Sequence, residues 1–419
     1  MNQGTKAVVW FKDVTKNDIP MVGGKGANLG EMTNAGIPVP PGFIVTAQAY
    51  FGFIEKARLQ DKIKSLLTPV DVHDSKQLQE VALKVQKLVM DAQMPADLAK
   101  EIAGAYVKMG KGLVAVRSSA TAEDLPEASF AGQQATFLNI EGEKEVVRAV
   151  QDCWASLFGA RAIFYRHEQG FDDFKVGIAV PVQRMVQSTS SGVMFTIEPT
   201  TSDAGKITIE AVLGLGEMIV SGDVTPDHYI VDKQTMKIST KQIKKHEWKL
   251  VKKTGAHGKD ENIKIDLTKE EQAKQKISDD DIIFLAKIGK TLEDHYNHPQ
   301  DIEWAKEDGE IYIVQTRPVT TIKKGKVSSH DIDAPVLLSG AAASPGVASG
   351  PVKIVPTPED IDKVLDGDIL VAEMTTPDFV PAMKRAAGIV TDRGGRTAHA
   401  AIVSRELGIP CVVGCEKAT

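Results

Sequence analysis

The chain has 419 residues, of which 42% are hydrophobic and 25% are charged, with a formal net charge of −6. This length predicts two or three domains, and the negative balance argues against a general nucleic-acid-binding protein. No apolar stretch approaches the length of a membrane helix, and the first residues lack the apolar segment of a secretory signal, so we expect a cytoplasmic protein that enters no membrane. Its three cysteines are too few for a four-cysteine zinc site.

The first motif is a glycine-rich turn, Gly23 to Gly26, ahead of a short helical pattern that ends at Gly36. Lys25 lies inside this turn, but Gly26 follows it where a Walker A loop would have serine or threonine. The motif is therefore a weak sign of phosphate binding, and a plain turn fits at least as well.

Helical patterns then extend over residues 50–109, and a short apolar strand at 113–116 ends at Arg117. A run of small and polar residues at 129–133 follows, which could cover a ligand or form an ordinary surface loop. Strand patterns occupy 174–186 and the following segments, in which Glu217 comes after Gly-Leu-Gly in a bend. Taken alone, Glu217 would be a surface glutamate.

The strongest constellation is QDIEWAKEDGEIYIVQTRPV, in which Asp308-Gly309 separates two strand patterns and signals a hairpin. Side chains alternate along a strand, so Asp301 and Glu303 share one face of the first strand, and Gln315 and Arg317 share one face of the second. Two adjacent carboxylates favour a cation between them, and Mg²⁺ bridging ATP phosphates is the natural candidate. A solvated sheet face with alternating polar residues is the alternative.

This hairpin makes a geometric demand. A regular two-residue loop would set Glu303 opposite Val314, and Gln315 would then point away from the carboxylates. An odd-length loop, or a bulge with the same effect, would instead set Glu303 opposite Gln315 and Asp301 opposite Arg317. We therefore predict an odd loop or a bulge, with all four side chains on the face toward the nucleotide.

After Pro318 the composition changes, and residues 319–336 read as a linker. A second region of strands, 337–419, contains TDRGGRTAHAAIVSR. Its apolar strand, 386–390, breaks at two glycines, Gly394 and Gly395, before a helical pattern with Thr397 as candidate N-cap and Gly408 as C-cap. His399 would lie in the first turn, where free N–H groups and the helix dipole stabilise an anionic group on an attacking imidazole. Arg393 and Arg396 add positive charge, although a satisfied histidine on an ordinary turn is the alternative.

GGRTAHAAIVSR resembles, residue for residue, the phosphohistidine motif of the phosphoenolpyruvate-utilising enzymes, and RSSATAEDLPEASFAGQQATFLNI is similar to the nucleotide-binding domain of the phosphoenolpyruvate synthase (pyruvate, water dikinase) family. The resemblance implies an α+β or α/β protein. It would have an ATP-grasp-like domain at 1–318, with lobes of about 1–190 and 191–318 that hold ATP between them. A swivelling β/β/α phosphohistidine domain would occupy 337–419 and be truncated at the end of the sequence.

The resemblance also implies a reaction, in which the β,γ-phosphates of ATP pass to His399 with release of AMP, as the first half of phosphoenolpyruvate synthesis from pyruvate, ATP and water. Arg117 and Arg317 would assist the transfer, Asp301 and Glu303 would hold Mg²⁺, and Thr397 is a candidate site of regulatory phosphorylation. Pyruvate would bind a barrel domain that this sequence does not contain, and a homo-oligomer is a further expectation. The residues implied to bind the nucleotide are Lys25, Arg117, Gly132, Thr136, Gln183, Glu217, Glu303, Gln315 and Arg317.

Three other functions use related modules. A different dikinase, such as pyruvate, phosphate dikinase or rifampicin phosphotransferase, has the same two parts, although VRSSATAEDLPEASFAGQQ favours the synthase family. A phosphocarrier like enzyme I of the sugar phosphotransferase system shares the histidine motif but has no ATP-grasp domain, so Arg117, Glu303 and Arg317 argue against it. A non-catalytic nucleotide sensor remains the third alternative.

Overall fold

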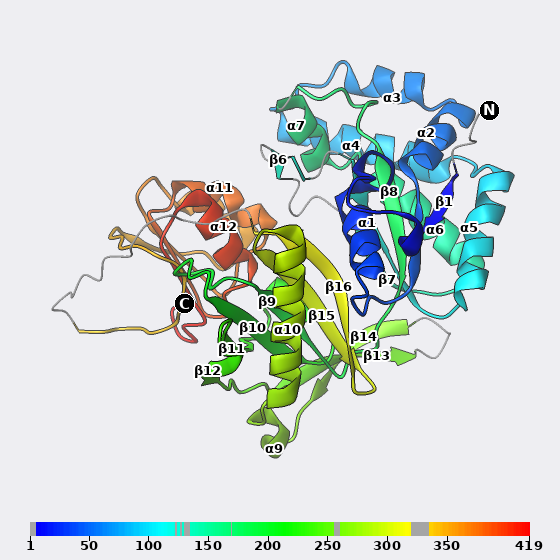
Figure 1. Cartoon of the computed structure of the whole chain (residues 1–419). Coiled ribbons are helices and arrows are strands. Elements are labelled where there is room, and N and C mark those ends of the chain that lie inside the picture. The colour runs from blue at the N-terminus through cyan, green and yellow to red at the C-terminus, as the bar shows by residue number, and fades with distance from the viewer. Residues whose placement is uncertain are drawn as a thin grey trace. The chain divides into compact units, whose positions relative to one another are not determined.

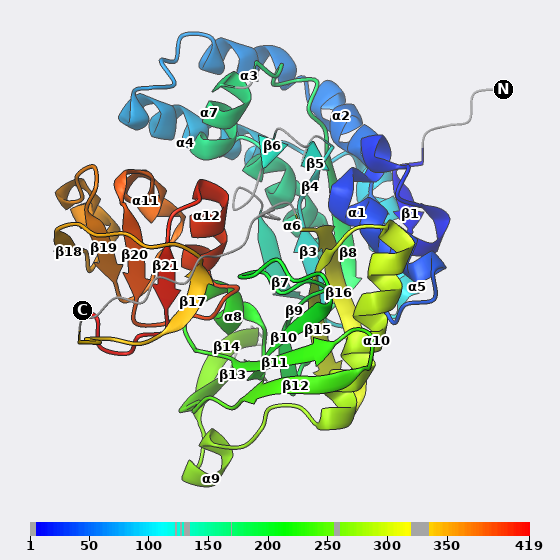
Figure 2. The ribbon, with the colours of Figure 1, turned by 60° about the vertical axis from the view of Figure 1, so that its left-hand side comes forward.

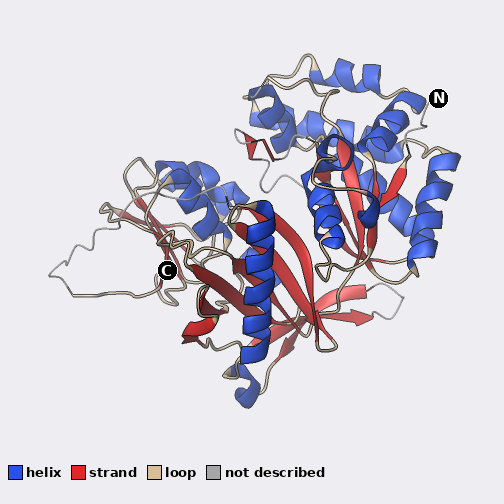
Figure 3. Cartoon of the chain, viewed as in Figure 1, coloured by secondary structure: helices blue, strands red, loops and turns tan. Residues whose placement is uncertain are grey.

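The computed structural model describes residues 6–121, 124–125, 128–129, 135–168, 170–254, 260–319 and 335–419. The chain divides into two compact units, Met1–Met185 and Val186–Thr419. Both mix helices with sheets (Figure 3), so the protein is of the α+β class. The three-part division expected from the sequence stays a prediction, and most of the expected linker, 320–334, lies outside the described residues.

Unit 1 is built on a six-stranded sheet in the order β1-β2-β8-β3-β7, with β4 paired to β8 (Figure 1). All of its strand pairs are antiparallel. The strands are β1 (Val8–Trp10), β2 (Gly42–Val45), β3 (Val114–Arg117), β4 (Ser119–Ala120), β7 (Thr136–Ile140) and β8 (Ile178–Arg184); β5 (Asp124–Leu125) and β6 (Ala128–Ser129) form a separate pair.

The helices of unit 1 are α1 (Ile19–Asn34), α2 (Ala47–Lys56), α3 (Gln60–Leu67), α4 (Ser75–Asp91), α5 (Ala96–Met109), α6 (Glu143–Ser156) and α7 (Ala160–Glu168), with a short 3-10 turn at Phe11–Asp13. Phe43, Val116 and Val182 point from one face of the sheet into a core shared with Trp154 of α6. The expected glycine turn is smaller than predicted. Only Gly23 leaves the helical conformation (φ 66°, ψ 173°), as a kink inside α1, and this position needs a glycine because a Cβ there would lie 2.4 Å from the Ser119 carbonyl oxygen.

Unit 2 contains a six-stranded antiparallel sheet in the order β12-β11-β10-β9-β15-β16. Helix α10 (Asp279–Tyr296) runs along one face of this sheet (Figure 1), where Gly289 lets it approach Met194. The strands are β9 (Ser190–Phe195), β10 (Lys206–Leu213), β11 (Asp227–Asp232), β12 (Lys237–Gln242), β15 (Gln300–Glu307) and β16 (Glu310–Pro318). Smaller elements are α8 (Glu217–Ser221), α9 (Lys269–Gln272) and the hairpin of β13 (Trp248–Thr254) with β14 (Asp260–Asp266).

The C-terminal part of unit 2 forms a five-stranded sheet in the order β17-β21-β20-β19-β18 (Figure 2). Leu370 and Ile389 pack from this sheet against Ala400 and Ala401 of α12. The elements are β17 (Ala341–Ser344), β18 (Val352–Ile354), β19 (Ile369–Ala372), β20 (Gly388–Thr391), β21 (Cys411–Val413), α11 (Val380–Arg385), α12 (His399–Leu407) and 3-10 turns at Pro358–Lys363 and Pro377–Phe379. In the part of the chain that is described, no helix combines the length and apolar character needed to span a membrane.

Candidate active site

Three of the predicted residues of unit 1 lie on one face of its sheet. Gln183 on β8 is opposite Ala115 on β3, and Arg117, two residues further along β3, is opposite Thr136 on β7. Directly opposed residues of antiparallel strands share a face, as do residues two apart on one strand. Gln183, Arg117 and Thr136 therefore point away from the face that carries the Phe43 and Val182 core.

Lys25 belongs to a helix on the same side. A Cβ on its neighbour Gly26 would lie 3.1 Å from Cδ1 of Ile44, so α1 packs on the face toward which Ile44 points. Ile44 is opposite Pro181 on β8 and is two residues from Gly42, which is opposite Gln183. The structure thus brings Lys25 to the side of the sheet that holds Arg117, Thr136 and Gln183, whereas Gly132 lies outside the described residues.

Gln183 is the most informative of these residues. Its side chain is only 1% exposed, and neither its amide oxygen nor its amide nitrogen has a hydrogen-bond partner within the described residues. An unpaired buried amide costs about 1–3 kcal/mol, so such groups point to a missing partner. A donor and an acceptor on one side chain match the edge of a nucleotide base.

In unit 2, the hairpin has both a regular turn and a bulge. The turn is a two-residue loop with positive φ at Asp308 (50°) and Gly309 (88°), so the hairpin does not use the odd-length loop, which was one of the two predicted alternatives. The predicted bulge, however, is confirmed: Val314 is skipped between the pairs Trp304↔Ile313 and Glu303↔Gln315. The extra residue reverses the side-chain alternation of β16, because the pleat has a period of two.

The bulge brings four predicted residues onto one face. Glu303 is opposite Gln315 and Asp301 is opposite Arg317, and the Arg317 Nε lies 2.9 Å from Asp301 Oδ2. The Asp301 side chain is largely buried, whereas that of Arg317 is exposed. Two carboxylates on one strand, with a phosphate completing the shell, are a common way for proteins to hold Mg²⁺, so these residues fit the ion. No cluster of three or more potential metal ligands occurs in the described ranges.

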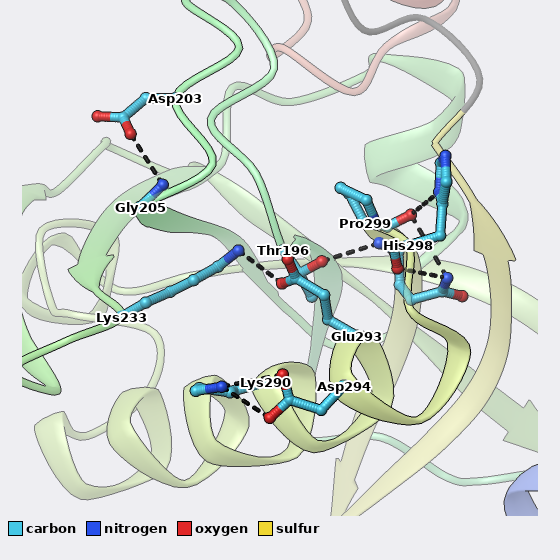
Figure 4. Close-up of polar contacts among 10 residues, drawn as sticks. Thr196, Asp203, Gly205, Lys233, Lys290, Glu293, Asp294, His298 and Pro299 are labelled. Atoms are coloured by element: carbon cyan, nitrogen blue, oxygen red, sulfur yellow. Dashed lines mark hydrogen bonds and ion pairs between the residues drawn. The ribbon is translucent and has the colours of Figure 1, made fainter.

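The start of β15 is held firmly. The backbone N–H of Gln300 donates to Thr196 Oγ1 at 2.8 Å, and Thr316 Oγ1 donates to the Gln300 side chain at 3.0 Å. Nearby, Lys233 and Glu293 form an ion pair between the six-stranded sheet and α10 (Figure 4). These bonds fix the strand end that presents Asp301.

Glu217 begins α8, on the same side of the sheet as Glu303. The next residues of α8, Met218 and Ile219, pack on Val193, which is directly opposite Glu303. Burial raises the pKa of Glu217, and a hydrogen bond donated by Asn262 Nδ2 at 2.6 Å lowers it in part, leaving it above the ordinary value. Glu217 is therefore placed to approach a ligand on this face through a short helix rather than through the strands.

The predicted histidine helix is confirmed. Helix α12 starts at His399 and ends at Gly408 in the left-handed conformation. The N-cap is Ala398, so the prediction of Thr397 as the cap is wrong. Thr375 Oγ1 lies 2.8 Å from His399 Nδ1, and this hydrogen bond holds the ring; which of the two groups donates depends on the tautomer of the imidazole.

Residues 394–397, which we call the histidine loop, are seated on the six-stranded sheet. Thr397 Oγ1 donates to Glu210 Oε2 at 2.6 Å and the Arg396 N–H donates to Glu210 Oε1 at 3.1 Å. The Arg396 guanidinium pairs with Glu198 at 2.7 Å. Gly395 is needed for this approach, because a Cβ there would lie 2.8 Å from Pro226 and 3.0 Å from the Glu210 carboxylate.

Sequence reasoning missed Glu210 and Glu198, and it expected Arg393 and Arg396 only to add positive charge near His399. The glycines serve contact with the sheet, and Arg393 pairs with Glu373 at 2.7 Å just as Arg396 pairs with Glu198. One signal was visible: Glu210 is a charge inside the apolar strand KITIEAVL. A carboxylate in a buried strand needs partners, which the distant histidine loop provides.

The strand register places Glu210, which the histidine loop contacts, in the same row of opposed residues as the hairpin residues Glu303 and Gln315. Glu210 is opposite Val193, Val193 is opposite Glu303, and Glu303 is opposite Gln315, so one row of side chains crosses four strands on one face. Two strand spacings separate Glu210 from Glu303, which is about 10 Å. The loop that carries His399 therefore lies over the face with the predicted metal and phosphate residues.

The α+β fold thus places a histidine at the start of a helix, directly after a loop that contacts the buried carboxylate of Glu210. The family described as the AMP/ATP-binding domain of pyruvate phosphate dikinase matches residues 19–334, and the chain belongs to this family. The mobile domain of the PEP-utilising enzymes matches residues 364–419.

The chain is similar to phosphoenolpyruvate synthases. It is 50% identical to that of Pyrococcus furiosus over 98% of this chain and 56% of that protein, and 44% identical to that of Aquifex aeolicus over 98% and 52%. A probable phosphoenolpyruvate synthase of Archaeoglobus fulgidus is 53% identical over 98% and 55%. The chain thus spans little more than half the length of the curated relatives it matches.

Proposed function

We propose that the chain is the phosphohistidine-forming part of a phosphoenolpyruvate synthase, in which ATP transfers its β,γ-phosphates to His399 and AMP is released. The observation that carries the proposal is the row from Glu210 to Gln315, because it sets the histidine loop over the Asp301, Glu303 and Arg317 face.

The chemistry follows from the local geometry. Thr375 holds Nδ1, so the Nε2 lone pair attacks the β-phosphorus, a nitrogen–phosphorus bond forms, and the bond from the β-phosphorus to the bridging α-phosphate oxygen breaks. Arg317 and the first turn of α12 supply positive potential to the transferring group. Mg²⁺ bound by Asp301 and Glu303 would neutralise charge on the phosphate oxygens.

The nucleotide residues divide by role. In unit 1, Gln183 would hydrogen-bond the base, and Lys25, Arg117 and Thr136 would hold the phosphates and sugar. In unit 2, Gln315 and Glu217 would complete the contacts to the phosphates and ribose. The finer fold assignment, an ATP-grasp-like domain with lobes of about 1–190 and 191–318 followed by a swivelling phosphohistidine domain, belongs to the same proposal.

The decisive experiment uses ATP labelled at the β-phosphate. The chain with Mg²⁺ should acquire label that is stable in alkali and labile in acid, as expected for phosphohistidine, and His399→Ala should acquire none. Gln183→Leu should weaken ATP binding while His399→Ala should not. Equal labelling of the His399→Ala variant would refute the assignment.

The second half of the reaction would need the remainder of a longer protein, in which water removes the γ-phosphate and pyruvate accepts the other phosphoryl group. A pyruvate, phosphate dikinase would use inorganic phosphate instead of water. Enzyme charged with γ-labelled ATP and incubated with and without phosphate separates the two, because only the synthase reaction releases the γ-phosphate in the absence of phosphate. We place the protein in the cytoplasm.

Thr397 carries a regulatory hypothesis. It is 4% exposed and its hydroxyl donates to a buried carboxylate. A phosphate there would repel Glu210 as well as an incoming nucleotide, so the loop could not be seated as observed. We expect Thr397→Glu to label His399 far more slowly than the parent. Equal rates would rule out this blocking mechanism.

A further inference from the structure

Gly395 of the histidine loop lies in a slot with two walls. A Cβ at this position would lie 2.8 Å from Cγ and Cδ of Pro226 on one side and 3.0 Å from Oε2 of Glu210 on the other. Non-bonded carbon atoms pack at about 3.5–4.0 Å, so only a glycine fits between these walls. The φ of Gly395 is not positive, so the close approach, and not the backbone conformation, requires the glycine.

The two walls differ in rigidity. The Glu210 side chain has several rotatable bonds, so its carboxylate can follow the Thr397 hydroxyl and the Arg396 N–H, which it accepts. The Pro226 ring has a fixed φ and no rotamers of comparable range. Hydrogen bonds to Glu210 therefore hold the loop on the sheet, whereas Pro226 limits how far the loop can move.

The backbone on both sides of Pro226 is anchored in the sheet. The carbonyl oxygen of Thr225, just before it, lies 2.9 Å from Nε2 of the buried His246. Asp227, just after it, is fully buried, pairs with Lys276 at 3.4 Å and accepts from the Lys276 backbone N–H at 3.0 Å. Pro226 is itself buried. Its ring is thus a fixed point against which a loop can be placed.

Two further glycines bring backbone close to the same loop. A Cβ on Gly222 would lie 3.3 Å from Cβ of Ala398, the residue before His399, and a Cβ on Gly414 would lie 3.1 Å from the Gly394 carbonyl oxygen. These contacts involve backbone and Cβ atoms, which have no side-chain torsion of their own. The segment that leads to His399 therefore has one closely packed position on the sheet.

We propose that Pro226 is a positioning residue for phosphoryl transfer, whose ring stops the histidine loop at Gly395 and so sets the distance from the His399 imidazole to the nucleotide face. Only three residues separate Gly395 from His399, so a displacement at the slot moves the imidazole. A misplacement of about 1 Å can lower a reaction rate about a hundredfold. This kinetic consequence rests on the proposed function, but the contact between Pro226 and the loop does not.

The first test is Gly395→Ala, which puts a methyl group into the slot. In single-turnover labelling of His399 with β-labelled ATP, we expect the maximal rate to fall about 10- to 100-fold. The ATP concentration for half-maximal rate should stay the same, because Gly395 is not one of the proposed nucleotide residues. Labelling at the parental rate, or a weaker apparent ATP affinity at an unchanged maximal rate, would overturn the proposal.

The second test adds Pro226→Ala, which removes the ring atoms that the new methyl group would meet. By itself, Pro226→Ala removes the stop and should slow labelling several-fold. Combined with Gly395→Ala, it should instead make labelling about tenfold faster than in Gly395→Ala alone. Such a reversal of sign requires a direct contact, and loss of stability alone would not produce it. Parental labelling in Pro226→Ala, or a double variant no faster than Gly395→Ala, would contradict the assignment.

A measurement without nucleotide separates this contact from the reaction. Amide exchange protection of residues 394–405 should fall in Gly395→Ala and recover in part in the double variant. Gly104→Ala in α5 is the matched control, because a Cβ there would meet no atom within 4 Å, and it should leave both labelling and exchange unchanged. A parent chain that fails to label would refute the proposed function, whereas equal exchange in the parent and Gly395→Ala would overturn the role of Pro226.

Discussion

Two buried acid–base pairs lie side by side on β11 and differ in how their needs are met. Asp227 is paired with Lys276 at 3.4 Å, and it also accepts from the Tyr229 hydroxyl and from two backbone N–H groups. Lys276 in turn donates to the carbonyl oxygens of Lys244 and Lys274. All these partners belong to the same sheet and its adjoining loops, so the hydrogen bonds of this pair do not depend on the histidine loop.

The next residue, His228, faces the other side of β11 with Glu210, and that pair is incomplete by itself. Its remaining hydrogen bonds come from Arg396 and Thr397, nearly 190 residues further along the chain. The contrast teaches how to separate two uses of buried charge. The hydrogen bonds of the Asp227–Lys276 pair are all made by nearby residues, so this pair is part of the fold of the sheet. The Glu210–His228 pair takes its hydrogen bonds from a loop distant in sequence, so it determines the position of that loop.

The largest effect should come from breaking the complete pair. Asp227→Ala leaves the Lys276 ammonium buried without a counter-charge, which costs about 3–5 kcal/mol of unfolding free energy. Urea denaturation of unit 2 measures this. Asp232→Ala, on the same strand but in a half-exposed pair with Lys206, should cost less than about 1 kcal/mol. Similar losses in the two variants would show that the two sites do not differ as we describe.

A pH effect of comparable size should arise beside Lys276. Burial, and then the charge of Lys276, lower the pKa of His246 to about 4. Since the unfolded chain binds this proton near pH 6.5, stability should fall as pH drops from about 6.5 to 4, by up to about 3 kcal/mol. Comparing His246→Gln with the parent at pH 7 and pH 4.5 isolates the contribution, because the variant should lose less stability on acidification.

The pair of Glu210 and His228 should respond differently from the pair of Asp227 and Lys276. Thr397→Val removes the donor to Glu210 without changing shape, and we expect it to weaken seating of the histidine loop by about 1–2 kcal/mol. Global unfolding of the six-stranded sheet should hardly change. Amide exchange of residues 394–405 reports the effect, and Thr397→Ser, which keeps the hydroxyl, serves as the control. Loss of global stability in Thr397→Val would place this hydroxyl with the structural pair instead.

The smallest stability effect is expected at the hairpin. Arg317 is half-exposed, so Arg317→Lys should change unfolding free energy by less than about 1 kcal/mol. Lysine cannot reproduce the forked donors, so labelling of His399 should nevertheless slow markedly. Thermal unfolding and single-turnover labelling of the same preparation test both statements, and a variant that loses both in parallel would contradict the second.

The sequence was sufficient where local patterns determine structure. The start of α12 at His399 and its end at Gly408 follow from apolar spacing and glycine, and the need for a bulge followed from counting residues in the hairpin. The N-cap was mispredicted because Thr397 has a better partner in Glu210, which no local pattern reveals. Glu198 and His228 were missed for the same reason, since their relevance depends on a loop far away in sequence.

The bulge in β16 also makes the two halves of the hairpin separable. Strand β15 is bonded on both sides, to β9 and β16, whereas β16 is the edge strand. A regular ladder that paired Glu303 with Val314 would turn Gln315 and Arg317 to the opposite face and leave Asp301 and Glu303 held by β9. The residues that we propose as phosphate donors and those that we propose as cation ligands therefore lie on independently adjustable strands, so a change in the bulge alone could alter the proposed anion contacts without rebuilding the carboxylate pair.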